Sequence, residues 1–389
     1  MAGVTSFRIP DRVLVGGGAR RRTGEVVAEF GVERPLIVTD RFLAGNGTAE
    51  EVAHALRSAG LAPTVWDGTV PDPTASSVEA SVEAARAHGA DSIIGLGGGS
   101  PMDTAKATAM LLARGGAMRD YKAPVVSTGH VLPVVAIPTT AGSGSEATQF
   151  TIITDDANHE KMLCAGPAFL PRAAIVDFEL TMSMPARLTA DTGVDALTHA
   201  IEAYVSRKAN PLSDTFALRA IRLVGEHLVT AYRDGSNAAA REAMMLASLQ
   251  AGIAFSNASV ALVHGMSRPI GAHFGIAHGL SNALLFAEVT RFSLPGAVSR
   301  YADCARALGA APADSDDETA SRALVEALER LVADVAVPHI LDLGVDPGTW
   351  AASLDEMASQ ALASGSPANN PVVPDHGQIV AIYERIAAR

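Results

Sequence analysis

The residues best suited to chemistry are a carboxylate and an imidazole four positions apart, Asp195 and His199. They lie in a stretch with helical periodicity, where residues four apart share one face. A carboxylate oxygen and an imidazole nitrogen on one face can bind the same divalent ion. Two ligands are too few for a tight site, and the later apolar stretch around His264 and His278 offers two more imidazoles.

Together these side chains predict a metal site with one oxygen and three nitrogen ligands. A single histidine on an apolar helix is more often a packed core group than a ligand, but four candidate ligands in one helical region favour the metal site. Ligands of this kind suit Fe²⁺ or Zn²⁺ better than Mg²⁺. Neither Cys164 nor Cys304 lies in a Cys-x-x-Cys motif, so no cysteine cluster or disulfide framework is expected.

A glycine-rich turn predicts a phosphate-binding loop. Gly97, Gly98, Gly99 and Ser100 follow a buried apolar run and open a helical pattern. Glycines let the backbone approach a phosphate closely, and the helix N-terminus offers free N–H groups and a partial positive charge. The spacing is not Gly-x-Gly-x-x-Gly, so the ordinary dinucleotide fingerprint does not apply. The alternative is a turn without a ligand, but three consecutive glycines are costly without a reason.

A second loop carries four hydroxyls after the next buried run: Thr139, Thr140, Ser143 and Ser145. Ligands of open α/β sheets bind at the carboxyl ends of the strands, so these hydroxyls are expected to line the same crevice as the glycines. Asp40 ends an earlier strand, where a carboxylate can bind both adenosine ribose hydroxyls and would repel a 2′-phosphate. This favours NAD over NADP, although an aspartate at a strand end is also common in solvated turns.

The elements that must position these residues fall into two groups. Up to about residue 185, short apolar runs alternate with helical patterns, which predicts a parallel sheet with crossover helices. Residues 6–18 predict two short strands around a Pro-Asp turn, and residues 149–165 include a predicted hairpin. We therefore expect an α/β dinucleotide-binding domain over residues 1–185.

After residue 185 only helical periodicity is found. Pro211 begins a helix that is expected to end near Arg233, and residues 238–255 are apolar nearly all round, as in a buried helix. We therefore expect an all-helical metal-binding and catalytic domain over residues 186–389.

Bulk properties limit the classes of protein to consider. The chain has 389 residues, 48% hydrophobic and 19% charged, which suits two domains with large cores. A formal net charge of −12 disfavours nucleic acid, because a binder needs a basic face. There is no secretion signal, and the apolar runs are interrupted well short of a membrane span. We expect a soluble cytoplasmic protein that does not bind membranes.

Taken together, the motifs resemble those of the iron-containing (group III) alcohol dehydrogenases. The resemblance covers nearly the whole chain, in order. It rests on Gly97 to Ser100 with Asp103 and Lys106, Pro138 to Glu146, Asp195 to Tyr204, and His264 followed by His278 to Asn282.

The resemblance implies a dehydroquinate synthase-like fold, with a Rossmann-like N-terminal domain and an all-α C-terminal domain. NAD(P) and the metal would face each other across the cleft, with Asp195, His199, His264 and His278 as ligands. Phe255 matches an aromatic residue of the substrate pocket, Lys161 a lysine near the cofactor, and Leu180 a residue that packs on its rings. The cofactor-binding residues would be Asp40, Gly97, Gly98, Gly99, Ser100, Asp103, Thr139, Thr140, Ser143, Ser145, Lys161 and Leu180.

One departure from the family concerns the proton. The family usually has a second histidine four residues after the third ligand, in the proton relay near the nicotinamide. Here that position is Arg268, an always-charged group that cannot readily act as a base. His273, on the same stretch, is the candidate substitute. Arg268 and His273 are therefore the candidate catalytic residues, and the proton route stays open.

The activity implied is reversible oxidation of a primary alcohol or short diol to its aldehyde, with hydride transfer to NAD. Alternatives on the same fold are a zinc polyol dehydrogenase, a maleylacetate-type reductase and a dehydroquinate-synthase-like lyase. From another class, a catalytically silent NAD-binding protein is favoured only by Arg268. The expected partners are a small-molecule substrate and further copies of the chain, in a homodimer or larger homo-oligomer.

Overall fold

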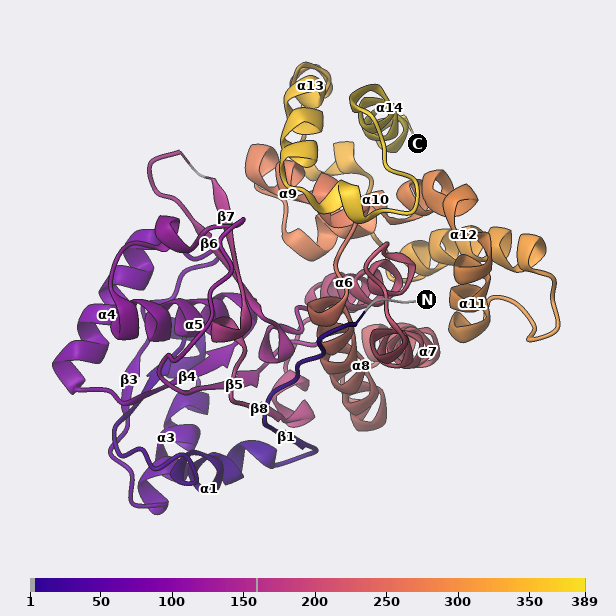
Figure 1. The fold of residues 1–389 in the computed structure, drawn as a ribbon. Coiled ribbons are helices and arrows are strands. Elements are labelled where there is room, and N and C mark those ends of the chain that lie inside the picture. The colour runs from indigo at the N-terminus through magenta and orange to yellow at the C-terminus, as the bar shows by residue number, and fades with distance from the viewer. Residues whose placement is uncertain (1–3, 159, 389) are drawn as a thin grey trace. The chain divides into compact units, whose positions relative to one another are not determined.

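The computed structural model describes residues 4–158 and 160–388, which divide into two compact units (Figure 1). One unit is Arg8–Met182, and the other joins residues 4–7 to residues 183–388. The first unit contains a parallel sheet with helices on it, and the second is helical. The predicted fold class, α/β followed by all-α, is confirmed.

The sheet of the first unit has six strands in the order β1-β8-β5-β4-β2-β3, all paired in parallel. The central strands β2, β4, β5 and β8 are buried at every position, which explains their unbroken apolar runs. The carboxyl ends of all six strands meet at one edge of the sheet. Their bounds are β1 (Arg12–Val15), β2 (Pro35–Val38), β3 (Thr64–Trp66), β4 (Ser92–Gly97), β5 (Val134–Pro138) and β8 (Ala173–Val176).

Alternate side chains of the strands pack against helices on the two faces of the sheet. Ile37, Ile94 and Ile175 belong to a core with residues of α1 and α3. Leu36 and Ile93 point the other way and pack with residues of α4 and α5. These helices, with the short α2, are α1 (Thr23–Ala28), α2 (Arg41–Gly45), α3 (Thr48–Ser58), α4 (Ala75–His88) and α5 (Gly99–Arg114).

The predicted hairpin is present. β6 (Phe150–Thr154) and β7 (Lys161–Ala165) pair in antiparallel register, with Phe150 opposite Ala165. The prediction for residues 6–18 was half wrong, because only β1 forms there. Residues 6–10 have no regular structure; Ile9 is 44% exposed, and Phe7 stacks on the ring of Phe216 instead of packing on the sheet.

Helices α7, α8, α9, α10 and α11 contact α6, which is buried at nearly every position. α7 begins as predicted, with Pro211 in its first turn and the Asn210 side chain capping it, and it ends at Arg233. The bounds are α6 (Ala186–Val205), α7 (Pro211–Arg233), α8 (Ala238–Asn257), α9 (Leu262–Phe274), α10 (His278–Ser293), α11 (Val298–Leu308), α12 (Asp317–Asp334), α13 (Pro347–Ala363) and α14 (His376–Ala387).

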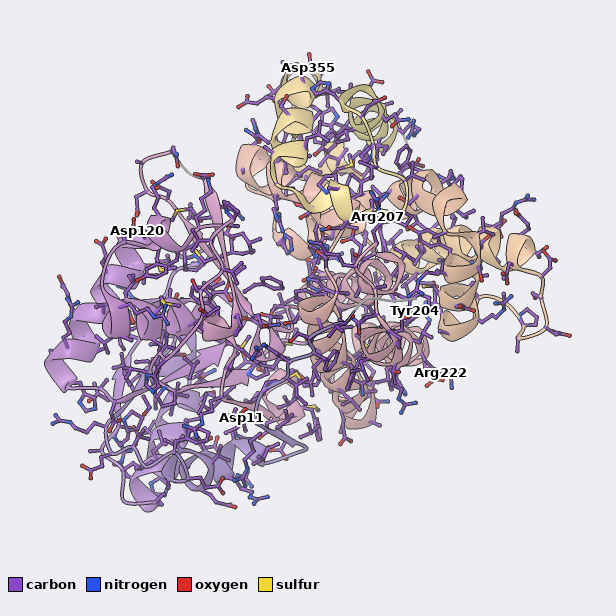
Figure 2. All side chains as sticks on the ribbon, in the orientation of Figure 1. Asp11, Asp120, Tyr204, Arg207, Arg222 and Asp355 are labelled. Carbon is purple, nitrogen blue, oxygen red and sulfur yellow. The ribbon has the colours of Figure 1, made fainter. Side chains whose placement is uncertain are left out.

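Tyr204, labelled in Figure 2, lies near the end of α6 and contacts α11. Its hydroxyl donates to Asp303 Oδ2 at 2.8 Å, and the Arg300 guanidinium carbon lies 3.9 Å from its ring centroid. α6 is therefore anchored by polar contacts as well as by its apolar neighbours. In the described part of the chain no single helix meets the length and hydropathy of a membrane span; α8 and α9 meet them only as a pair bent by 105°.

Candidate metal centre and dinucleotide loop

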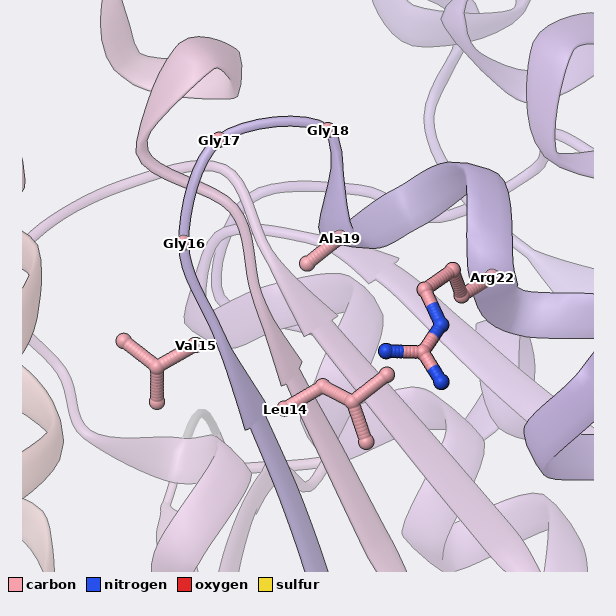
Figure 3. A pocket seen from close by; sticks show the side chains of 7 residues that line it. All are labelled: Leu14, Val15, Gly16, Gly17, Gly18, Ala19 and Arg22. Carbon is pink, nitrogen blue, oxygen red and sulfur yellow. The ribbon is translucent and has the colours of Figure 1, made fainter.

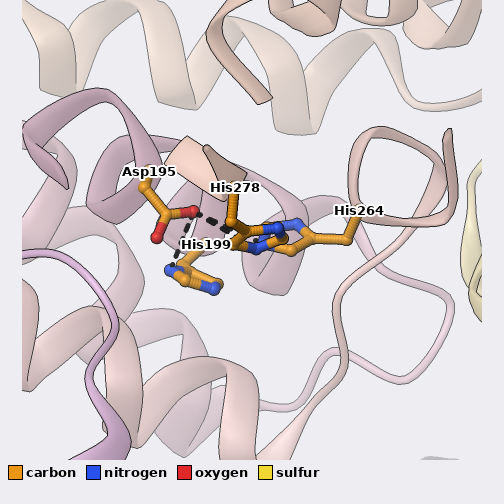
Figure 4. A group of neighbouring side chains, drawn as sticks. All are labelled: Asp195, His199, His264 and His278. Carbon is orange, nitrogen blue, oxygen red and sulfur yellow. Dashed lines mark ion pairs between the residues drawn. The ribbon is translucent and has the colours of Figure 1, made fainter. Parts of the chain in front are cut away.

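Three helices bring the four predicted ligands together. Asp195 and His199 lie one turn apart on α6, His264 lies in the first turn of α9, and His278 begins α10. One ligand atom from each of the four lies within 4.8 Å of all the others (Figure 4). Residues up to 83 positions apart in sequence thus converge on one point, as the sequence predicted.

The donor separations suit a divalent ion. Asp195 Oδ1 lies 3.8 Å from His199 Nδ1, 3.6 Å from His264 Nε2 and 3.9 Å from His278 Nε2. Ligand atoms bound at about 2.0–2.2 Å in a tetrahedron lie roughly 3.4 Å apart. The four residues therefore fit an ion with small adjustments of their side chains.

Three of the four ligand side chains are buried, and Asp195 is negatively charged, as a cation site requires. The side chains of Asp195, His199 and His264 are buried, while that of His278 is 37% exposed. Burial would raise the pKa of Asp195, but the charge of His199 and the contacts with His264 and His278 outweigh it and hold that pKa well below its usual range. Asp195 is therefore a carboxylate, and the site opens on the side of His278.

Glu202 fixes the third ligand and was overlooked as a functional residue in the sequence. Its carboxylate accepts hydrogen bonds from the backbone N–H groups of Ala261, at 2.8 Å, and Val263, at 2.6 Å. Oε2 also lies 2.6 Å from His264 Nδ1. With Nδ1 bound to Glu202, Nε2 of His264 faces Asp195. The signal in the sequence was its place on α6, three residues after His199 on the same face.

Two further side chains frame the ligands. Asn282, one turn into α10, donates from Nδ2 to Asp195 Oδ1 at 2.7 Å and lies 3.2 Å from His264 Nε2. The ring of Phe255 stacks on His199, with centroids 4.2 Å apart and planes 14° apart. The structure thus places Phe255 directly beside the four ligands.

The glycine turn of the first unit is built for close approach. Gly97 ends β4 with a φ of 148°, and a Cβ there would lie 2.5 Å from Pro101 Cγ, so any other residue would be strained. Gly98 precedes α5 and gives it no side-chain cap, which leaves the N–H groups of the first turn for a ligand such as a phosphate. Ser100 lies in that first turn.

The second predicted loop lies beside these glycines. β5 pairs with β4, and Thr139 donates its N–H to Gly97 O at 2.9 Å. Positions for a Cβ on Gly98 and Gly99 lie 3.5 Å from Thr140 and Ser143 side-chain atoms. The two motifs therefore meet at the carboxyl edge of the sheet, where dinucleotides bind in open α/β folds.

Comparison with known proteins assigns both units to one family. A family model described as iron-containing alcohol dehydrogenase matches residues 10–178, and one for the C-terminal part of the Fe-containing alcohol dehydrogenase family matches residues 189–387. The chain belongs to the iron-containing alcohol dehydrogenase family.

Individual members of this family are similar to the chain along its whole length. An NAD-dependent methanol dehydrogenase of Bacillus methanolicus is 37% identical over 381 residues, covering 97% of this chain and 99% of the relative. A 1,3-propanediol dehydrogenase of Klebsiella pneumoniae is 35% identical, covering 97% and 98%. The solved structure of a 1,3-propanediol oxidoreductase superposes with a TM-score of 0.95 at 34% identity, covering 99% of this chain and all of the other.

The two candidate catalytic residues, Arg268 and His273, lie on different faces of α9. Arg268 follows His264 by one turn of α9, and its Nη1 donates to Ser366 Oγ at 3.2 Å. His273 lies near the end of α9, where Nε2 is 3.1 Å from Gln360 Oε1 of α13. Nine residues of helix rotate a side chain by about 900°, to the face opposite His264. His273 accordingly lies outside the group of four ligands.

Some residues of the family's glycine and serine motifs serve the interior of the fold. Lys106 is fully buried, with Nζ 2.9 Å from Ser145 Oγ and 2.8 Å from Phe150 O. Asp103 accepts from Ser145 Oγ at 2.7 Å and from Ile152 N at 2.9 Å. Asp103, Lys106 and Ser145 thus join α5 to the second loop and to β6.

Glu146, the residue after Ser145, is buried, and neither of its carboxylate oxygens has a hydrogen-bond partner among the described residues. Burial raises its pKa to about 7 and lowers that of Lys106 to about 8. Burial therefore outweighs the opposing effects of the backbone at Glu146 and of the Lys106 charge, which both favour the charged carboxylate.

The remaining predicted cofactor residues have contacts of their own. Asp40 follows β2 and its Oδ1 caps α2 by accepting from Leu43 N at 2.9 Å. Lys161 Nζ lies 2.9 Å from Asp72 Oδ1. Leu180 is partly buried against the core under α1 and α3. All three lie in the first unit, and the structure gives each a protein partner.

A hollow of about 350 Å³ lies at the end of β1 (Figure 3). The turn of Gly16, Gly17 and Gly18 arches over it, and the side chains of Leu14 and Arg22 point toward each other within it. Asp177 holds the turn by accepting from Gly18 N at 3.1 Å. Since β1 runs parallel to β4 and β5, this turn shares the sheet edge with the glycine loop.

Proposed function

We propose that this member of the iron-containing alcohol dehydrogenase family interconverts a primary alcohol and its aldehyde with NAD as hydride carrier. The balanced reaction takes alcohol and NAD⁺ to aldehyde, NADH and a proton. The observation that carries the proposal is the convergence of Asp195, His199, His264 and His278, together with a phosphate-competent turn on the sheet of the other unit.

The four residues would hold Fe²⁺, with Zn²⁺ as the alternative occupant. A divalent ion there supplies a Lewis acid for the alcohol or aldehyde oxygen. Asp195 contributes the charge, Glu202 and Asn282 hold the ligands in place, and the half-exposed side of His278 leaves room for a substrate oxygen. Phe255, stacked on His199, would limit the width of the substrate beside the ion.

The turn of Gly97 to Gly99, with Ser100, would bind the pyrophosphate of NAD through backbone N–H groups. Thr139, Thr140 and Ser143 would line the same crevice. Asp40 would bind the adenosine ribose and disfavour NADP, which requires its carboxylate to accept from the ribose as well as from Leu43 N. Lys161 would lie near the cofactor, and Leu180 would pack on its rings.

The proposal is tested by loading metal-free protein with Fe²⁺ or Zn²⁺ and following NADH formation from short alcohols and terminal diols. We expect turnover that depends on the ion and is faster with NAD than with NADP. Joint substitution Asp195→Ala and His199→Ala should abolish both ion binding and turnover. Full activity in that variant would refute the metal role, and bound NAD without NADH formation would favour a lyase or a silent NAD-binding protein.

We further propose a homodimer or larger homo-oligomer, which the length-wide similarity to the family supports. Light scattering on a size-exclusion column measures the mass directly. A monomer at assay concentration would exclude it.

A further inference from the structure

One cation on the helix of His264 forms no ion pair within the described residues. Arg268 follows His264 by four residues on α9, so both side chains leave the same helical face, with Cβ atoms roughly 5–6 Å apart. In the described chain its guanidinium makes one hydrogen bond, to Ser366 Oγ at 3.2 Å, and no ion pair. A guanidinium has five N–H donors, so most of those on Arg268 have no protein acceptor in that part of the chain.

The guanidinium is held in place by its surroundings. Ser366 is buried in the turn Ser366–Asn369, which packs closely on α9, since a Cβ on Gly265 would lie 2.8 Å from Pro367 Cδ. Arg268 itself is half-buried, so part of its side chain reaches solvent. Burial lowers the pKa of Arg268, the charge of Glu202 opposes that change, and an arginine remains charged at any working pH.

The charges around the ligands do not balance once an ion is present. Asp195 and Glu202 contribute two negative charges, while a divalent ion and Arg268 contribute three positive ones. Before substrate and cofactor bind, the sum is one positive charge in a partly buried region, where an unpaired charge is costly. An anionic group on the substrate would neutralise it and use the free donors of Arg268.

We propose that the substrate carries a carboxylate, as in a short ω-hydroxy acid and its ω-oxo acid, and that Arg268 is the specificity-determining residue that binds it. The planar fork of an arginine matches a carboxylate by two parallel hydrogen bonds, which a lysine cannot reproduce. The one-turn separation of His264 and Arg268 requires only a short carbon chain between the reacting oxygen and the carboxylate. The inference rests on the proposed alcohol dehydrogenase function.

The first test compares two four-carbon substrates, 4-hydroxybutyrate and 1,4-butanediol, on the metal-loaded enzyme with NAD. We expect kcat/KM to be higher for the hydroxy acid. Arg268→Gln should lower kcat/KM for the hydroxy acid roughly 10- to 100-fold more than kcat/KM for the diol, the range for one hydrogen-bond partner of a charged group. Arg268→Lys should restore part of the loss. Arg207→Gln, on the exposed loop after α6, removes the same charge and should change kcat/KM for neither substrate.

A second test needs no turnover. Butyrate should bind the enzyme–NADH complex, measured by calorimetry, and Arg268→Gln should weaken that binding 10-fold or more, while butanol binding stays unchanged. The inference is wrong if the wild type has the higher kcat/KM for the diol and butyrate does not bind. It is also wrong if Arg268→Gln lowers kcat/KM equally for both substrates, as a purely structural role would. Failure of the proposed function gives a different result, because neither substrate then yields NADH while butyrate binding can still be measured.

Discussion

Glu202 on α6 and His264 on α9 are joined by a 2.6 Å contact between Oε2 and Nδ1. The same carboxylate binds the N–H groups of Ala261 and Val263, so it holds the start of α9 and the ring orientation of a candidate ligand at once. Burial alone would lower the pKa of His264, but the charge of Glu202 and the hydrogen bonds to Asp195 and Glu202 outweigh it and raise that pKa. A carboxylate behind a ligating histidine increases its basicity toward a metal.

Replacing Glu202 with glutamine should weaken ion binding roughly 10- to 100-fold, the usual effect of losing such a carboxylate. The amide puts an N–H donor against groups that also donate, so the His264 ring should lose its fixed orientation. Competition with a chromophoric chelator measures the affinity. Glu288→Gln is the matched control, because Glu288 is equally buried on α10 but pairs with Arg385 at 3.1 Å. Equal ion affinity in both variants would exclude the positioning role.

The glycine turn gives a second prediction. Gly97→Ala must place a Cβ 2.5 Å from Pro101 Cγ at a φ of 148°, so we expect a loss of about 1–3 kcal/mol in the free energy of unfolding, together with weaker NAD binding. Gly60→Ala has a φ of 82° but no atom within 4 Å of the new Cβ. It should lose stability without any change in NAD affinity, measured by fluorescence titration. Unchanged NAD binding in Gly97→Ala would argue against the turn as the phosphate site.

Glu146 should make stability depend on pH. Its pKa of about 7 in the folded protein lies above the ordinary 4.5, so folding holds a proton that the unfolded chain releases between these values. The contribution is complete below pH 4.5 and disappears as pH rises through 7. Between these pH values the free energy of unfolding of the wild type should therefore fall by about 1–3 kcal/mol relative to that of Glu146→Gln. Denaturant unfolding at several pH values measures the difference. Glu83→Gln on α4, which removes the same kind of side chain at an exposed position, is the matched control. Parallel pH profiles of wild type and Glu146→Gln would contradict the prediction.

Phe255 should limit the width of the substrate. Phe255→Ala removes the ring stacked 4.2 Å from His199, and we expect kcat/KM for a branched or aromatic alcohol to rise about 10-fold relative to a linear one. Ion content should stay the same, which separates a wider pocket from a damaged metal site. Phe216→Ala is the control, because that ring stacks on Phe7 instead. A ratio unchanged by Phe255→Ala would place the substrate elsewhere.

The fold could be predicted where local pattern and burial agree. Unbroken apolar runs predicted β2, β4 and β5 because both faces of those strands are covered. The start of α7 was visible because Asn210 and Pro211 carry its cap in adjacent positions. The strand expected before β1 does not form, because a short run of residue types cannot show whether a partner strand exists.

The candidate site divides in the same way. Asp195 and His199 are visible because their relation is local, four residues on one helix. The role of Glu202 was hidden because its partners lie about 60 residues away, at Ala261 and Val263. Lys106 stands in a recognisable motif, yet only the structure shows that it is a buried link between α5 and β6 rather than a surface cation.

Three tasks depend on one short segment of α6, where Asp195 and His199 are candidate ligands and Glu202 orients another. Inserting or deleting a single residue between 195 and 202 would rotate one part of the set by about 100° against the other. No shift of a neighbouring helix could restore all three contacts. The loop of residues 309–316 between α11 and α12 lies at the surface and carries no such constraint. Changes of chain length, by evolution or by design, should therefore accumulate in loops of that kind and be absent from this segment.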